Sequence, residues 1–157
     1  MAFIKNTENI LYDCVAALLV NDSKALCLQL RDQKKNIFFP GLWGLFGGSV
    51  ETNELPEKAL IREIYEELEI IVEKPKKILT VTIASPINSL DGKKRHFFLV
   101  KLSDQQIADI VLHEGQGYKF FDPDKIPSPH ELAPVDACGI IYCCHTILKP
   151  RVIIPEF

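Results

Sequence analysis

The 157-residue sequence lacks the features that mark secreted proteins, membrane-spanning proteins and proteins that bind nucleic-acid polymers. No apolar run approaches the roughly 20 residues that a bilayer-spanning helix needs. The N-terminal segment has neither the apolar stretch nor the small-residue cleavage site of a secretory signal. Lysine and arginine are scattered and the formal net charge is −3, so no basic surface for nucleic acid or an anionic membrane is expected. We therefore expect a cytoplasmic protein.

Cysteine is present, but not in a pattern that binds zinc. The five cysteines are irregularly spaced, at positions 14, 27, 138, 143 and 144. The paired C-x-x-C spacing that structural zinc sites use is absent. Cys143 and Cys144 adjoin in an apolar stretch, where buried free thiols are common. The sequence thus predicts reduced and inert core cysteines.

Length and composition predict one domain spanning residues 1–157, because the chain can bury a sizeable core and shows no repeat, low-complexity tract or linker. The expected strands are residues 14–20, 25–31, 42–48, 78–87, 94–102 and 118–123, and the expected helices are residues 54–69 and 134–149. A turn at 21–24 joins the first two strands as a hairpin, and Asp91-Gly92 joins the fourth and fifth. This order predicts an α/β (α+β) fold, in which helices pack on a mixed sheet.

Three carboxylates of the 54–69 helix lie at one edge of its apolar face. At 100° per residue, Glu63, Glu66 and Glu67 fall within an arc of about 100°. Leucine and isoleucine side chains occupy the neighbouring arc, which must face the core. Like charges beside a buried face repel one another unless a cation neutralises them, and hard divalent cations prefer oxygen ligands. On spacing alone, a metal site and a solvated acidic face both stay open.

Two adjacent glycines precede this helix. Gly47 and Gly48 let the backbone turn sharply and leave their carbonyl groups unshielded by side chains. A carbonyl at this strand end can join the helix carboxylates around a cation. The pair therefore favours the metal site, although an ordinary turn would use the same two residues.

Residues 48–70, GSVETNELPEKALIREIYEELEI, resemble the Nudix box of the Nudix hydrolases. The family pattern is Gly, five residues, Glu, seven residues, Arg-Glu, an aliphatic residue, any residue, Glu-Glu, any residue, Gly and an aliphatic residue. The residues that match this pattern are Gly48, Glu54, Arg62, Glu63, Ile64, Glu66, Glu67 and Ile70. Glu69 departs from it, because it stands where the family has a glycine that resembles a helix C-cap, so the end of the helix is open to question.

The resemblance implies an α/β/α sandwich and a reaction. Nudix enzymes use Mg²⁺ or Mn²⁺ to cleave a pyrophosphate bond in a nucleoside diphosphate linked to another moiety. By analogy Glu63, Glu66 and Glu67 hold the metal with the Gly47 carbonyl, and these glutamates count among the catalytic residues. Glu54 and Arg62 resemble an orienting pair, although an ordinary salt bridge would look the same.

The general base is expected outside the box. Residues 113–121 resemble the stretch of MutT-type nucleotide pyrophosphohydrolases in which a loop glutamate approaches the metals, and Glu114 takes that position. The alternative is a solvated loop residue. His113 is expected to be exposed.

The substrate is expected to be a small nucleotide, such as a normal or oxidised (d)NTP or a nucleoside diphosphate sugar or alcohol. The candidate substrate-binding residues are three cations, Arg31, Lys34 and Lys35, and three aromatic residues, Phe38, Phe39 and Trp43. The cations could hold phosphates and the aromatic rings could stack on a base. A solvated basic loop and a core position for Phe39 stay open, as does a homodimer.

Two rival classes share the fold. One resembles isopentenyl diphosphate isomerase, and the other is a non-catalytic Nudix-fold protein that binds a nucleotide or regulates a partner. The complete set of box glutamates argues against both, because non-catalytic relatives often lose these residues.

Overall fold

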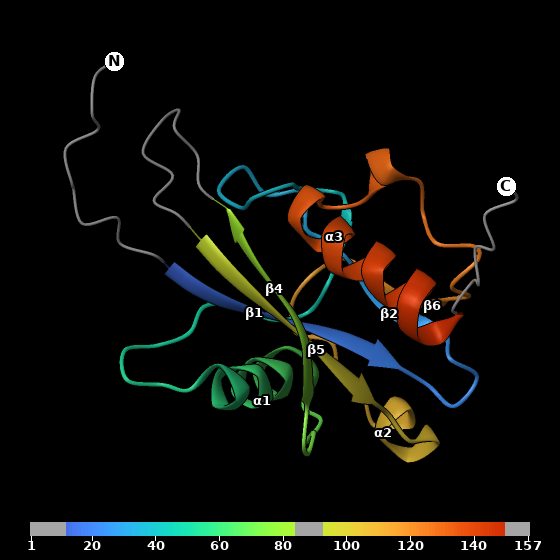
Figure 1. Cartoon of the computed structure of the whole chain (residues 1–157), viewed down its shortest axis with the longest axis horizontal. Coiled ribbons are helices and arrows are strands. Elements are labelled where there is room, and N and C mark those ends of the chain that lie inside the picture. Colours follow the sequence, from blue (N-terminus) through green and yellow to red (C-terminus); the bar gives the residue numbers. More distant parts are fainter. Residues whose placement is uncertain (1–11, 84–92, 150–157) are drawn as a thin grey trace, which may run out of the picture.

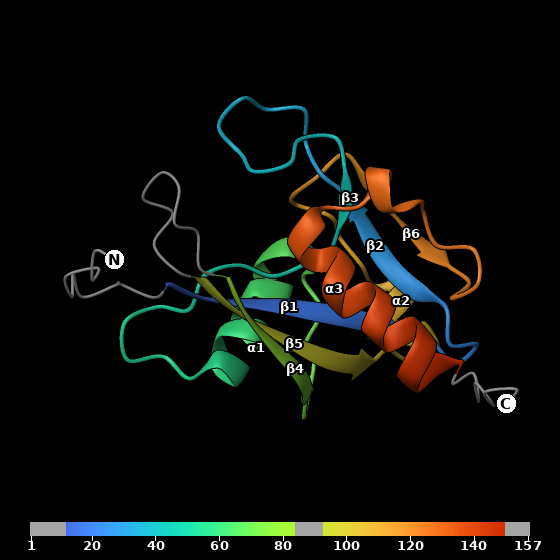
Figure 2. The same cartoon turned by 45° about the horizontal axis from the view of Figure 1, so that its top comes forward.

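The computed structural model describes residues 12–83 and 93–149, and it shows a mixed sheet between two helical layers (Figure 1). The elements are β1 (Tyr12–Val20), β2 (Leu26–Leu30), β3 (Trp43–Gly44), α1 (Pro56–Leu68), β4 (Lys76–Ile83), β5 (Lys93–Lys101), α2 (Asp104–Ala108), β6 (Gly117–Phe121) and α3 (Pro134–Cys143). A 3₁₀ turn at Pro129–Glu131 precedes α3, and a π-helical turn at Cys144–Leu148 follows it. Helices α1 and α3 lie on opposite faces of the sheet (Figure 2). The predicted α/β/α sandwich is confirmed.

Strand β1 is the centre of the sheet. It pairs in parallel with β5 along its whole length, and β5 pairs antiparallel with β4. Its pairing with β2 is antiparallel but reaches only Leu19 and Val20, so the two strands diverge from their hairpin. The chain after β3 fills the gap, because Phe46 and Ser49 form bridges to β1. Gly47 and Gly48 therefore lie in the middle of the sheet, where β1 and β2 separate.

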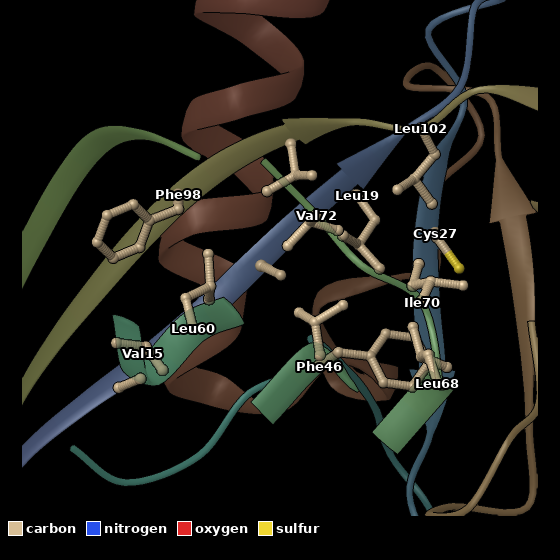
Figure 3. Close-up of a cluster of buried hydrophobic side chains, with 14 residues drawn as sticks. Val15, Leu19, Cys27, Phe46, Leu60, Leu68, Ile70, Val72, Phe98 and Leu102 are labelled. Atoms are coloured by element: carbon tan, nitrogen blue, oxygen red, sulfur yellow. The ribbon is translucent and has the colours of Figure 1, made fainter. Parts of the chain in front are cut away.

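The core has two parts, one on each face of β1. Residues 15–20 are all buried, and alternate side chains face α1 or α3, as expected for a strand covered on both sides. Figure 3 shows the α1 side, where Leu60 lies beside Val15 of β1 and Leu68 lies beside Phe46. Burial of these side chains holds α1 against the sheet and so sets the position of its acidic edge.

The structure differs from the sequence-based expectations mainly in two places. Helix α2 was not expected, although Ser103 and Gln106 form a capping box, which is a sequence signal of a helix start. The strand expected at 42–48 has only two residues in regular pairing, because the following residues bend across to β1. The pairing of β4 with β5 agrees with the predicted hairpin, but its Asp91-Gly92 turn lies outside the described residues.

All five cysteines are free thiols, as expected, but not all are core residues. Cys27, Cys143 and Cys144 are buried, and burial raises the pKa of each thiol to about 11 or 12. Cys14 is half-buried, and Cys138 is exposed on α3, so the core prediction is wrong for Cys138. Among the described residues, no helix is both long and apolar enough to cross a membrane.

Candidate active site on the acidic helix

Helix α1 begins and ends with local signals. Pro56 occupies its first turn, where a missing N–H costs nothing, and Glu57 adds a favourable negative charge there. At the other end Glu69 adopts the left-handed conformation with φ 55°, and its N–H donates to the Tyr65 carbonyl at 2.9 Å. Glu69 thus ends the helix as a glycine would, at a cost of about 1–2 kcal/mol for a residue with a side chain.

Arg62 connects helix α1 to the segment that precedes it. Its Nε and Nη2 atoms donate to the two Glu54 carboxylate oxygens at 3.0 and 2.9 Å, and Nη2 also donates to the Ser49 carbonyl at 3.0 Å. The hydrogen bonds from Arg62 lower the pKa of Glu54, and the Glu54 carboxylate is the main cause that raises the pKa of Arg62. The predicted pair therefore exists as a bidentate fork, which fastens residues 49–54 to the helix.

The same guanidinium reaches two of the candidate metal ligands. Nη1 donates to Glu63 Oε1 at 2.9 Å and to Glu66 Oε2 at 3.3 Å. The Glu63 side chain is 16% exposed, and its pKa is raised by burial, whereas Arg62 opposes that shift. The Glu66 side chain is 57% exposed. A side chain at Gly48 would overlap the Glu63 carboxylate, so the second glycine provides the space that this carboxylate occupies.

Glu67 differs from both, because it is 6% exposed. Its Oε2 accepts the N–H of Gly47 at 2.7 Å. Burial raises the pKa of Glu67 to about 8, the Gly47 N–H opposes this shift, the charges of Glu114 and Glu63 add to it, and Arg31 opposes it. The helix wheel placed this carboxylate at the edge of the apolar face, and the segment that contains Gly47 covers it.

The carboxylate and carbonyl oxygens of the site are suitable ligands for a hard cation, but the described side chains do not form one metal-binding cluster. Within residues 12–83 and 93–149, no three side chains of His, Cys, Asp or Glu lie close enough to hold a metal ion. Arg62 binds Glu63 and Glu66 instead. Burial, and then the charges of Glu114 and Glu63, disfavour the ionised form of Glu67. A divalent cation stabilises a carboxylate of this kind.

The Gly47 carbonyl is the one main-chain group that the sequence predicted as a metal ligand. The carbonyls on either side of it, Phe46 and Gly48, accept the N–H groups of Ala17 and Val15 at 2.8 Å each. No hydrogen bond to the Gly47 carbonyl occurs in the described part of the chain. The positive φ of 127° at Gly47 turns this peptide out of the strand pattern, and only glycine adopts it readily.

Glu114 lies within electrostatic reach of two of these carboxylates. It is exposed in the loop between α2 and β6, and the preceding residue, His113, donates its N–H to the Glu67 carbonyl at 2.9 Å. The negative charge of Glu114 raises the pKa of both Glu67 and Glu63. The loop residue is therefore within electrostatic reach of two candidate metal ligands.

The substrate candidates divide into two groups. Arg31 is half-buried and its charge opposes the raised pKa of Glu67. Lys34 pairs with Asp32 at 2.6 Å, which raises the pKa of Lys34, as does the charge of Glu114. These two cations thus lie near the carboxylates.

The second group lies farther along the loop that connects β2 to β3 and projects from the molecule in Figure 2. Lys35 and Phe38 are exposed, and Phe39, with φ 54°, is 38% exposed, so the core alternative for Phe39 is wrong. Trp43 packs edge-on against Phe121 with ring centroids 5.0 Å apart, and it is half-buried at the base of this loop.

The sequence analysis did not identify Gln29. This side chain is buried in β2 and its Nε2 donates to the Glu114 carbonyl at 2.9 Å. A single glutamine in an apolar strand matches no motif, so no local signal could have marked it.

Comparisons with known proteins agree with this geometry. The family model described as NUDIX domain matches residues 11–140. Nucleoside triphosphatase NudI of Escherichia coli O81 (strain ED1a) is 31% identical over 121 residues, which cover 71% of this chain and 82% of that protein. The protein of the same name from Escherichia coli (strain SE11) is 34% identical over the same coverage.

Solved structures share the fold. A MutT NUDIX hydrolase from Burkholderia pseudomallei superposes with a TM-score of 0.68 at 25% identity, and the match covers 83% of this chain and 95% of that one. A MutT protein from Methanosarcina mazei Go1 gives a TM-score of 0.69 at 22% identity, with 92% of this chain and 99% of that chain covered.

Proposed function

Because this chain belongs to the NUDIX domain family and is a nucleotide pyrophosphohydrolase, we propose that it cleaves the pyrophosphate bond of nucleoside triphosphates. The observation that carries this proposal is the set of three box carboxylates on α1, Glu63, Glu66 and Glu67, with Glu114 of a distant loop within electrostatic reach of two of them. The named activity of the NudI relatives supports the triphosphate as substrate. The isomerase and non-catalytic alternatives are not favoured.

Nudix hydrolases generally use divalent metals, and we propose Mg²⁺ or Mn²⁺ for this one. Glu63, Glu66, Glu67 and the Gly47 carbonyl would hold the metal. When bound, a divalent cation supplies charge neutralisation at the phosphate oxygens and so eases attack by water on phosphorus. Because Arg62 now binds Glu63 and Glu66, these two carboxylates would have to leave the guanidinium at least in part.

The other side chains have separate roles in the proposal. The fork between Arg62 and Glu54 holds residues 49–54 against the helix and so keeps Gly47 and Gly48 beside the carboxylates. Glu114 accepts the proton of the attacking water as the general base.

The loop after β2 holds the substrate in this proposal. Arg31 and Lys34 bind phosphate oxygens, since Arg31 lies within electrostatic reach of Glu67, and Lys34 within electrostatic reach of Glu114. Lys35 and Phe39 contact the more distant part of the nucleotide, where an aromatic ring can stack on any base. A cytoplasmic location and a homodimer stay predictions.

The decisive experiment is a hydrolysis assay on a panel of nucleoside triphosphates, nucleoside diphosphate sugars and isopentenyl diphosphate, with Mg²⁺, with Mn²⁺ and with chelator. We expect turnover of triphosphates that requires a divalent cation. Calorimetric titration with the metal alone should show binding, and the metal should raise the melting temperature, because it binds the folded state. Absence of turnover on the whole panel would overturn the proposal, and isomerisation of isopentenyl diphosphate would replace it.

A further inference from the structure

Gln29 is a buried polar side chain in the middle of an apolar strand. It is 1% exposed and follows three buried residues of β2, Leu26 to Leu28. An amide removed from water is costly unless it forms hydrogen bonds. Its Nε2 donates to the main-chain carbonyl of Glu114 at 2.9 Å, 85 residues later in the sequence. The buried amide therefore binds the backbone of the candidate general base.

The residue after Glu114 packs directly on Gln29. Gly115 has φ 89°, and a side chain at this position would overlap the Gln29 side chain and the Leu30 carbonyl. Gln116 then continues along the strand, since its N–H donates to the Leu30 carbonyl at 2.8 Å and its Nε2 to the Arg31 carbonyl at 2.7 Å. The loop is thus held against β2 from Glu114 onward.

The other side of the loop is held against the end of α1. The N–H groups of Val111 and His113 donate to the carbonyls of Leu68 and Glu67 at 3.0 and 2.9 Å. His113 Nε2 also lies 2.6 Å from Glu69 Oε1, but about half of each side chain is exposed. An exposed pair of this kind contributes little, whereas the bond from the buried Gln29 amide is partly shielded from water.

We propose that Gln29 is a positioning residue for the reaction, because its amide fixes the main chain at Glu114 and so the place from which that carboxylate acts. The inference rests on the proposed function. Gln29 touches neither substrate nor metal in this account, and its effect passes entirely through Glu114. By fixing Glu114, Gln29 controls the distance between the reacting groups. A misplacement of about 1 Å can lower the rate about 100-fold.

The test is a double-mutant cycle with Gln29→Met and Glu114→Gln, assayed with a nucleoside triphosphate and Mg²⁺. Methionine has a similar length but cannot donate a hydrogen bond. We expect Gln29→Met to lower kcat about 10- to 100-fold with KM within about two-fold. Glu114→Gln should lower kcat by about 10²–10⁴. The double variant should be no slower than Glu114→Gln alone, because Gln29 then has no base to place.

The matched control is Gln106→Met. Gln106 Nε2 also donates to a main-chain carbonyl, that of Ile71 at 2.7 Å, but it lies at α2. This control should keep wild-type kcat, and both methionine variants should be melted to measure their stability. If Gln29→Met does not fold, Gln29→Asn retains an amide that is one methylene too short and takes its place.

Three results would overturn the inference while leaving the proposed function intact. The first is a Gln29→Met enzyme with wild-type kcat. The second is a double variant whose loss of kcat equals the product of the two single losses. That result is expected for two independent effects or for a structural role of Gln29. The third is Glu114→Gln with wild-type turnover, which would leave triphosphate hydrolysis in place but assign the general base to another residue. A wild-type enzyme that hydrolyses no nucleotide would instead overturn both proposals at once.

Discussion

The acidic edge of α1 and the loop between β2 and β3 are built in different ways. On the helix, Glu67 is buried against Gly47, and Arg62 binds Glu54 in a fork. On the loop, Phe39 is exposed, and the ion pair of Lys34 with Asp32 lies at the surface. The contrast indicates that the side chains proposed for the chemistry are held by packed contacts, whereas those proposed to bind substrate are exposed. Changes on the helix should therefore affect kcat, and changes on the loop should affect KM.

The largest effect is expected from Glu67→Gln. The change removes a charged candidate metal ligand, so kcat should fall by about 10²–10⁴ while the fold survives, because an amide oxygen can still accept the Gly47 N–H. Turnover with Mg²⁺ and the melting curve in chelator measure the two properties. A variant that melts well below wild type yet hydrolyses normally would show that Glu67 is a structural residue.

The second prediction concerns pH. The pKa of Glu67 is about 8 in the folded protein, against about 4.5 when unfolded, so the Glu67 carboxyl keeps its proton to a higher pH in the folded state. The stabilisation is complete below the unfolded pKa and is lost as pH rises through the folded one. In chelator, wild type should therefore lose stability from about pH 4.5 to 8, by at most about 1.4 kcal/mol per pH unit from this group.

Glu67→Gln supplies the control for the pH experiment. The variant lacks the titrating group, so the difference in unfolding free energy between it and wild type, measured with denaturant at pH 5.5 and pH 8, isolates Glu67. The raised pKa of Glu63 acts in the same direction but is present in both proteins. A difference that does not change with pH would show that burial does not perturb this carboxylate.

A smaller effect is expected on the loop. Lys34→Ala removes one cation within electrostatic reach of Glu114, so KM for a triphosphate should rise only about two- to five-fold with kcat nearly unchanged, since exposed ion pairs contribute little. Lys101→Ala is the control, because Lys101 also forms an exposed ion pair, with Asp22 at 2.8 Å. Loss of kcat in the Lys34 variant would place this lysine in the chemistry rather than in binding.

The smallest effect is expected at the end of the helix. Glu69→Gly relieves the left-handed conformation but makes the unfolded chain more flexible and removes the exposed contact with His113. The stability should therefore rise by no more than about 1 kcal/mol, with kcat within about two-fold of wild type. Denaturant unfolding and the triphosphate assay measure both. A large fall in kcat would show that the helix side of the Glu114 loop matters as much as Gln29.

Local periodicity determined much of this protein from its sequence. The apolar run of residues 14–20 and the acidic edge of α1 can both be recognised from neighbouring residues, because a buried strand needs a short apolar run and the faces of a helix follow from its 3.6-residue repeat. The match to the family box identified the reaction class, and the substitution at Glu69 is visible only against that box.

Tertiary structure alone decided how these groups differ. Glu66 and Glu67 are adjacent in the sequence, yet one is exposed and the other is buried under Gly47, from a segment 20 residues earlier. Glu114 lies in a distant loop within electrostatic reach of Glu67, and Gln29 binds the main chain of Glu114 across 85 residues. A helix wheel contains no information about what covers the helix. Burial sets the pKa of Glu67, and it arises only when separate elements pack together.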